Sequence, residues 1–196
     1  MIVETARYWS TRAEKKKIGD TYRYEMTEVI GPDEYHEPVD NSVFTNAVAR
    51  WNLQKAMELL DLLKETRPEV HKDIVKQHKI TDKELEKWQD VADKIKINFD
   101  PKTGLYEEFD GYFQLEGQGK IIKQADVLLM LHLLPELRTT EIFRKNFEVY
   151  YPVTDHGSSL SPGVHVLFAL DIGYKDHAYR YEVQSCEIDG LSLIHI

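Results

Sequence analysis

The sequence repeats one pattern along most of its length, in which apolar residues recur at intervals of three and four between short polar segments. The clearest case is the segment 43–65, whose apolar stripe consists of Val48, Trp51, Leu53, Met57, Leu60 and Leu63. Such spacing places the apolar side chains on one face of a helix, which must be buried against another element. We therefore expect an all-α fold made of helices packed on helices.

Further helices are expected over 1–17, 67–79, 81–96, 121–135, 139–151, 161–173 and 174–188. The helix over 81–96 begins with Thr81, followed three residues later by Glu84, as in a capping box. Residues 21–29 alternate polar and apolar, as in a short strand, and the turn residues of 97–119 predict an excursion with short strands. Periodicity alone leaves a bundle, a solenoid and an α/α barrel open, although no repeat of fixed period favours the solenoid.

Composition narrows the class of protein further. The 196 residues are 42% hydrophobic, enough for one globular domain or a piece of a larger one. The net charge of −9 argues against nucleic acid as a partner, and the single cysteine, Cys186, excludes an internal disulfide framework. No apolar run is long enough to span a bilayer, and no secretory signal is recognisable, so we expect no membrane partner and a cytoplasmic protein.

The segment 29–46, "VIGPDEYHEPVDNSVFTN", concentrates charge and stiffness in one connection. Its acidic residues are Asp33, Glu34, Glu37 and Asp40. Gly31 and Pro32 shape a turn that could aim a carboxyl group into a cleft. Alternatively, the acids are solvated and Asp40 and Asn41 only cap the following helix.

Three other segments offer groups suited to binding. In "KQADVLLM", Lys123 and Gln124 present several donors at one point, suited to sugar hydroxyls, although a lysine here could simply reach solvent. "TDHGSSLSP", residues 154–162, combines a glycine, hydroxyls and a helix start, which favours an anion site over capping alone. In "YEEFDGYFQL", residues 106–115, the aromatic residues could contact a carbohydrate, but packing is the favoured interpretation.

Taken in order, six motifs resemble the catalytic domain of glycoside hydrolase family 65. They are "ETARYW", "YEMTEVIGPDEYHEPVDNSVFTN", "FDGYFQL", "IKQADVLLML", "RKNFEVYYPVTDHGSSLSP" and "AYRYEVQSCEID". Within that family they look like the disaccharide phosphorylases that act on maltose, kojibiose, trehalose and related α-glucosides. The resemblance runs from residue 1 to about residue 189.

The resemblance implies part of an (α/α)6 barrel and an inverting phosphorolysis that yields β-glucose 1-phosphate and a released sugar. It implies that Glu34 is the general acid and that Lys123 and Gln124 hold the glucosyl unit. It assigns the phosphate site to "HGSS", with Ser158 and Ser159 binding phosphate and His156 and Gly157 shaping the loop. The partners would be a disaccharide and inorganic phosphate as co-substrate, with no cofactor, and relatives of this kind are often homodimers.

The chemistry of the residues agrees with this division of roles. Inversion needs one carboxylic acid to protonate the leaving oxygen, while a nucleophile attacks the opposite face of the sugar. Phosphate is already an anion, so donors that position it can replace a base. Because Glu34 must carry a proton near neutral pH, we expect it to lie buried among other carboxylates, where desolvation and like-charge repulsion favour the protonated form. The histidines show no metal-ligand spacing, so no metal is expected.

Some features depart from the family pattern. A six-hairpin barrel needs twelve helices, and this sequence supplies about half of them. The ending "LSLIHI" also breaks from the family pattern, so we expect residues 190–196 to be a non-native or disordered tail. Two other functions stay open: a hydrolase of the same family, such as an acid trehalase or a glucosidase acting on glycosylated collagen, and a helical fragment without activity of its own.

Overall fold

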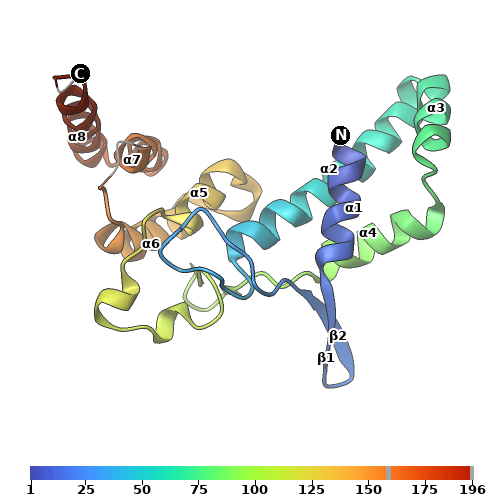
Figure 1. Cartoon of the computed structure of the whole chain (residues 1–196), viewed down its shortest axis with the longest axis horizontal. Helices are drawn as coiled ribbons and strands as arrows, with labels where there is room; N and C mark the ends of the chain where they lie inside the picture. The colour runs from blue at the N-terminus through green and yellow to red at the C-terminus, as the bar shows by residue number, and fades with distance from the viewer. Residues whose placement is uncertain (158–159, 195–196) are drawn as a thin grey trace. The chain divides into compact units, whose positions relative to one another are not determined.

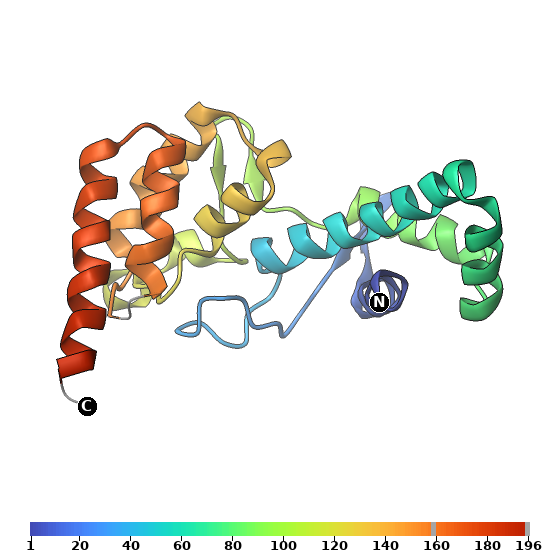
Figure 2. The same ribbon diagram turned by 90° about the horizontal axis from the view of Figure 1, so that it is seen from above.

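The computed structural model describes residues 1–157 and 160–194. Helices dominate it, with two short antiparallel hairpins between them (Figures 1 and 2). The chain forms two compact units, one from Met1–Thr27 and Thr45–Ile97 and the other from Glu28–Phe44 and Asn98–Ile196. The predicted all-α class is confirmed in its coarse form, and the closed (α/α)6 barrel stays a prediction.

The first unit contains two strands and most of the polar helices. Its elements are α1 (Ile2–Arg12), β1 (Glu14–Ile18), β2 (Thr21–Glu25), α2 (Val43–Thr66, whose first two residues belong to the second unit), α3 (Pro68–His78) and α4 (Asp82–Lys94). Its core is formed by the apolar faces of α1, α2 and α4 together with the buried Tyr24 of β2, and includes Val3, Ala6, Leu53, Ala56, Trp88 and Val91. The predicted apolar stripe of α2 is therefore buried in part, since Trp51 is exposed while Leu53 and Leu60 are not.

The expected helix over 1–17 is wrong beyond Arg12. Residues Glu14–Ile18 pair instead with Thr21–Glu25 in an antiparallel hairpin, turning at Gly19, whose φ is +58° (Figure 1). Tyr22 lies under the ammonium group of Lys15, 3.4 Å from the ring centroid, and stabilises the pairing across the strands. These contacts depend on a neighbouring strand, so helical spacing read along a single segment could not reveal them.

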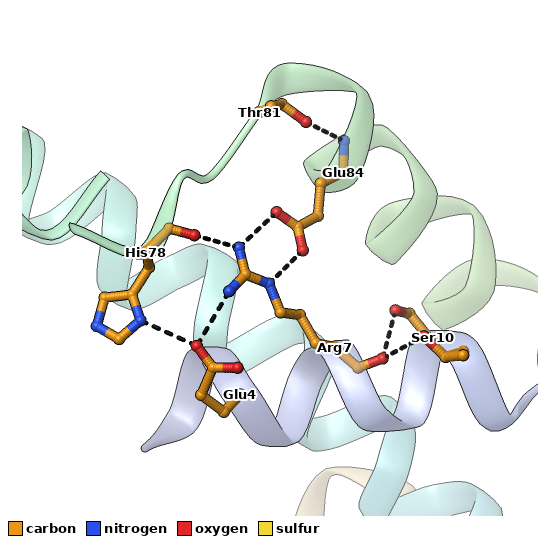
Figure 3. A network of polar contacts seen from close by, with 7 residues as sticks. Glu4, Arg7, Ser10, His78, Thr81 and Glu84 are labelled. Atoms are coloured by element: carbon orange, nitrogen blue, oxygen red, sulfur yellow. Dashed lines mark hydrogen bonds and ion pairs between the residues drawn. The ribbon is translucent and has the colours of Figure 1, made fainter. Parts of the chain in front are cut away.

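A network around Arg7 joins α1 to the start of α4 (Figure 3). The guanidinium group of Arg7 donates two hydrogen bonds to the carboxylate of Glu84, at 2.6 and 3.1 Å, and one to the carbonyl oxygen of His78. Thr81 caps α4 by accepting a hydrogen bond from the backbone N–H of Glu84 at 3.2 Å. The predicted cap is confirmed, but the Glu84 side chain binds Arg7 rather than returning to Thr81, so one acid links two helices.

The second unit contains the other α-helices and all of the described 3₁₀ helices (η). Its elements are β3 (Phe99–Asp100), β4 (Leu105–Tyr106), η1 (Tyr112–Gln114), η2 (Gly117–Lys120), α5 (Asp126–Leu133), η3 (Pro135–Leu137), α6 (Thr140–Tyr150), η4 (Tyr151–Val153), α7 (Leu160–Asp171) and α8 (Lys175–Ile194). Helices α7 and α8 lie side by side as an antiparallel pair (Figures 1 and 2). The predicted excursion over 97–119 is confirmed, because β3 and β4 form its hairpin.

The helix expected from residue 121 begins later, at Asp126. Residues before it form backbone hydrogen bonds with the chain after α6: the N–H of Ile122 donates to Val153, and the N–H of Asp155 donates to Ile122, at 3.0 and 2.7 Å. These bonds satisfy backbone groups that a helix would otherwise use. The extended segment 121–125 therefore brings Lys123 and Gln124 next to the chain that leads to "HGSS".

Aromatic side chains from α6, α7 and α8 fill the core of the second unit. Phe143, Phe147 and Phe168 are almost fully buried, and His165 lies among them at 0% exposure. The Nδ1–H of His165 donates to the carbonyl oxygen of Ser161 at 2.8 Å. The ring centroids of His165 and His156 are 4.7 Å apart. Burial lowers the pKa of His165 to about 4.

Helix α8 extends through residues 190–194, which the sequence analysis placed in a tail, and residues 195–196 lie outside the described part of the chain. The non-native origin of these residues stays a prediction. Within the described residues, no helix combines the length and apolar character needed to cross a bilayer.

Replacing Thr81 by alanine should lower the free energy of unfolding of the first unit by about 1 kcal/mol, because the N–H of Glu84 loses its acceptor. All three tryptophans, Trp9, Trp51 and Trp88, lie in this unit, so urea denaturation followed by tryptophan fluorescence reports its unfolding. Thr81→Ser keeps the hydroxyl and should remain close to the unchanged protein. Equal stability of the alanine and serine variants would contradict the role of the cap.

The low pKa of His165 predicts a loss of stability in acid. Between pH 6.5 and pH 4 the unfolded chain binds a proton at this histidine that the folded chain does not, so stability is complete above about pH 6.5 and falls as the pH drops toward 4. The loss is on the order of 3 kcal/mol. His165→Asn, measured by urea denaturation and circular dichroism, should flatten the curve below pH 6.5 and leave its slope unchanged between pH 7 and 8. A parallel fall in both proteins would refute the assignment.

Candidate functional site

Parts of the four segments singled out in the sequence, 29–46, 106–115, 123–130 and 154–162, lie together within the second unit. The stretches in contact are residues 31–36, 107–112, 119–126 and 153–157. The first three meet around the carboxylate of Asp33, and the fourth joins them through hydrogen bonds to Ile122 and Tyr35. Four separate sequence motifs therefore belong to one site.

Asp33 is the centre of this arrangement and is 3% exposed. Its Oδ1 atom accepts hydrogen bonds from the backbone N–H of Lys123, at 2.7 Å, and from that of Tyr35, at 3.2 Å. Its Oδ2 atom lies 2.6 Å from Nδ1 of His36. This acid is buried and both of its oxygens are hydrogen-bonded, so the alternative that the acids of this loop are solvated does not hold for Asp33.

His36 must share a proton with Asp33. Its Nε2 atom lies 2.7 Å from the carbonyl oxygen of Gly119, and a carbonyl can only accept, so Nε2 carries hydrogen. The facing Nδ1 and Oδ2 atoms then need a proton between them. Two backbone N–H groups bind the other oxygen, Oδ1, of the same carboxyl group. The histidine ring packs on Phe109, with centroids 5.1 Å apart.

Two further carboxyl groups are buried beside Asp33. Glu108 and Asp126 are 1% and 2% exposed, and three of their four carboxyl oxygens have no hydrogen-bond partner within the described residues. Burial raises the pKa of Glu108 well above its usual range, and the neighbouring Asp126 and Asp33 carboxyl groups raise it further. Burial, followed by the charge of Asp33, also raises the pKa of Asp126. Both groups therefore favour the protonated form at neutral pH.

Gly31 makes this packing possible. A Cβ atom at Gly31 would lie 2.2 Å from Oδ2 of Asp126 and 3.1 Å from Oγ of Ser42. Real Cβ atoms do not approach other atoms at 2.2 Å, so only glycine allows the Asp126 carboxyl to rest against this turn.

Glu34 follows Asp33 and forms an ion pair with the ammonium group of Lys123. The structure thus brings the predicted acid into contact with a predicted sugar-binding residue. The expected burial of Glu34 is wrong, however, because its side chain is 61% exposed and the buried acids are its neighbours. The hydrogen bond to Glu34 raises the pKa of Lys123, which keeps this lysine charged.

The other predicted residues lie around this pair. Gln124 is half-buried, and its carbonyl oxygen accepts the N–H of Asp126 at 3.1 Å. His156 is half-buried with Nδ1 3.0 Å from Oγ of Ser161, and Gly157 is exposed. Ser158 and Ser159 lie outside the described residues.

A hydrogen bond links the acid loop to the segment that leads to the predicted phosphate site. The hydroxyl of Tyr35, the residue after Glu34, donates to Oδ2 of Asp155 at 2.6 Å. Asp155 immediately precedes His156 and Gly157, and a Cβ at Gly157 would lie 3.3 Å from its Oδ1 atom. Three predicted parts, the acid, the sugar-binding lysine and the phosphate loop, are therefore connected through named contacts.

Sequence reasoning missed the supporting residues Glu108 and Asp126. Asp126 stands at the start of a strongly apolar helix, where a charged residue is unusual unless it is partnered, and this was the available signal. Phe109 and Tyr112 were expected to pack, and both are buried, whereas Phe113 is 40% exposed. Within the described residues no group of three or more histidine, cysteine or acidic side chains could hold a metal ion.

A mostly helical chain in which a carboxylate lies beside an ammonium group, in a loop bonded to the segment before His156 and Gly157, fits a carbohydrate-active enzyme of helical fold. The family model described as the glycosyl hydrolase family 65 central catalytic domain matches residues 1–119 and 116–193. The chain therefore belongs to glycosyl hydrolase family 65.

Relatives with known activities fall into two groups. The chain is 38% identical to the kojibiose phosphorylase of Thermoanaerobacter brockii, over 96% of this chain and 27% of that protein. It is 41% identical to the protein-glucosylgalactosylhydroxylysine glucosidase of Danio rerio, over 84% of this chain and 22% of that protein. The chain thus spans about a quarter of the length of these curated relatives.

The fold is similar to a solved structure as well. This structure, described as a proposed kojibiose phosphorylase from the human microbiome, superimposes with a TM-score of 0.80 at 26% identity. The match covers 92% of this chain and 27% of the other.

Replacing Gly31 by alanine should lower the free energy of unfolding by about 1–3 kcal/mol, because the new methyl group would clash with Asp126. Gly119→Ala is a matched control, since its Cβ would meet only the Cβ of Leu115, at 3.9 Å, and its carbonyl could still accept from His36. Urea denaturation followed by circular dichroism measures both. Equal stabilities of the two variants would contradict the close approach at Gly31.

Proposed function

We propose that the complete enzyme containing this chain catalyses the inverting phosphorolysis of an α-glucosyl disaccharide, giving β-glucose 1-phosphate and a released sugar. Glu34 is the general acid, Lys123 and Gln124 bind the glucosyl unit, and the "HGSS" segment binds inorganic phosphate. The observation that carries the proposal is the contact between Glu34 and Lys123, in a loop hydrogen-bonded to the segment that precedes His156. The family and the phosphorylase relatives support it.

The exposed ion pair suggests how the acid acquires its proton. In the free chain the Glu34 carboxylate lies against the ammonium group of Lys123. When sugar hydroxyls take hydrogen bonds from Lys123 and exclude water, Glu34 loses both its counter-ion and its solvation, and both changes favour the protonated form. Substrate binding therefore prepares the acid to protonate the leaving oxygen.

Phosphate then acts as the nucleophile from the opposite face of the glucosyl ring. It attacks the anomeric carbon while the bond to the leaving sugar breaks and the proton of Glu34 passes to the departing oxygen. The bound anion needs no base to activate it. Backbone amides and hydroxyls of "HGSS" have the right chemistry to hold it in place.

A hydrolase is the second candidate, and the similarity to the glucosidase of Danio rerio favours it. A hydrolase needs a second carboxylate that activates water. Its reaction would release free glucose in phosphate-free buffer, whereas a phosphorylase would be inactive there. If the complete enzyme releases glucose without phosphate, the phosphorylase proposal is wrong.

The proposal is tested with the complete enzyme, phosphate and a panel of glucose disaccharides, measuring glucose 1-phosphate. Glu34→Gln should lower its formation on the order of 100-fold or more, because the amide cannot donate a proton to the leaving oxygen. Glu37→Gln is the matched control, since Glu37 is exposed in the same loop, and it should retain activity. Near-normal turnover of the Glu34 variant would reject the assignment.

A further inference from the structure

We propose that Asp33 and Asp126 are positioning residues that clasp two segments together and so set the contact between Glu34 and Lys123. This inference rests on the proposed function, because it concerns how the acid and the sugar-binding lysine are held. Neither aspartate touches the groups that would react.

The clasp is reciprocal. Asp33, in the loop 31–36, uses its carboxylate to bind the backbone N–H of Lys123 at 2.7 Å. Asp126, three residues after Lys123, rests with its carboxyl group against the backbone of Gly31, where a Cβ atom would lie 2.2 Å from Oδ2. Each segment therefore supplies one carboxyl group that contacts the backbone of the other.

The two bound backbone positions are those that aim the functional side chains. Asp33 precedes Glu34 directly, and the N–H fixed by Asp33 is that of Lys123 itself. Both aspartates are almost completely buried, whereas Glu34 is 61% exposed and so has little packing of its own to hold it. The position of Glu34 must therefore be set by the backbone that carries it.

His36 and Tyr35 extend the clasp at its two sides. The imidazole of His36 connects Asp33 to the carbonyl oxygen of Gly119, which leads into the segment of Lys123. Tyr35 connects the loop to Asp155. The loop that carries Glu34 is thereby fixed on both sides of that residue, while its side chain stays accessible.

The clasp makes a specific kinetic prediction in the complete enzyme. Asp126→Ala should lower kcat about 10-fold to 100-fold, because a small displacement of a catalytic group is enough for a loss of this size. Asp126→Asn should stay within about threefold of the unchanged enzyme, since the amide has nearly the shape of the acid and can rest against Gly31 in the same way. A merely structural role would change the yield or melting temperature and leave kcat per folded molecule unaltered.

A double-mutant cycle separates this inference from the proposed function. If Asp126 acts through Glu34, adding Asp126→Ala to the Glu34→Gln enzyme should cause little further loss. Full additivity of the two losses would overturn the inference while leaving the phosphorylase proposal intact. An active Glu34→Gln enzyme would overturn the proposed function itself, and the inference with it.

Amide hydrogen exchange in this chain provides a test that needs no activity. Asp33→Ala should speed exchange at the amide of Lys123, because that N–H loses its acceptor. The amide of Val39, bonded to Val29 at 2.9 Å, is the internal reference and should keep its protection. If Asp33→Ala does not fold, Asp33→Ser replaces it, because the shorter side chain also withdraws from Lys123. Unchanged exchange at Lys123 would overturn the clasp.

Discussion

The second unit depends on the burial of the Asp33 carboxylate. A buried charge is costly unless hydrogen bonds and an opposite charge compensate it. Here the backbone N–H groups of Lys123 and Tyr35 and the ring of His36 provide that compensation. These partners come from the loop 31–36 itself and from the segment before α5. Hydrogen bonds to the Asp33 carboxylate therefore also fix the geometry of both segments.

The arrangement would fail if all three neighbouring carboxyl groups were ionised. Asp33, Glu108 and Asp126 are all buried in the second unit, where like charges repel strongly. The raised pKa values of Glu108 and Asp126 ease this repulsion, because burial favours the protonated form of both groups. Protonation thus lets one cluster of acids serve as a rigid support.

Much of the helical fold could be predicted from the sequence, because a helix that buries one face has apolar residues at intervals of three and four. The α4 cap at Thr81 and the excursion over 97–119 were predicted correctly for similar reasons. The hairpin after Arg12 and the late start of α5 were not, since both depend on partners distant in sequence. For the site, the motifs identified residues that meet in space, but the exposure of Glu34 and the burial of Asp33 depend on a tertiary arrangement that no motif encodes.

The buried cluster of Asp33, Glu108 and Asp126 also bears on which reaction the site can perform. A hydrolase needs a second carboxylate that reaches water, whereas Asp33, Glu108 and Asp126 are buried. The accessible groups include the carboxylates of Glu34 and Glu37, the ammonium group of Lys123 and the loop at His156 and Gly157. In the proposed phosphorolysis the nucleophile brings its own negative charge, so the protein supplies an acid and a place for the anion, and no base is needed.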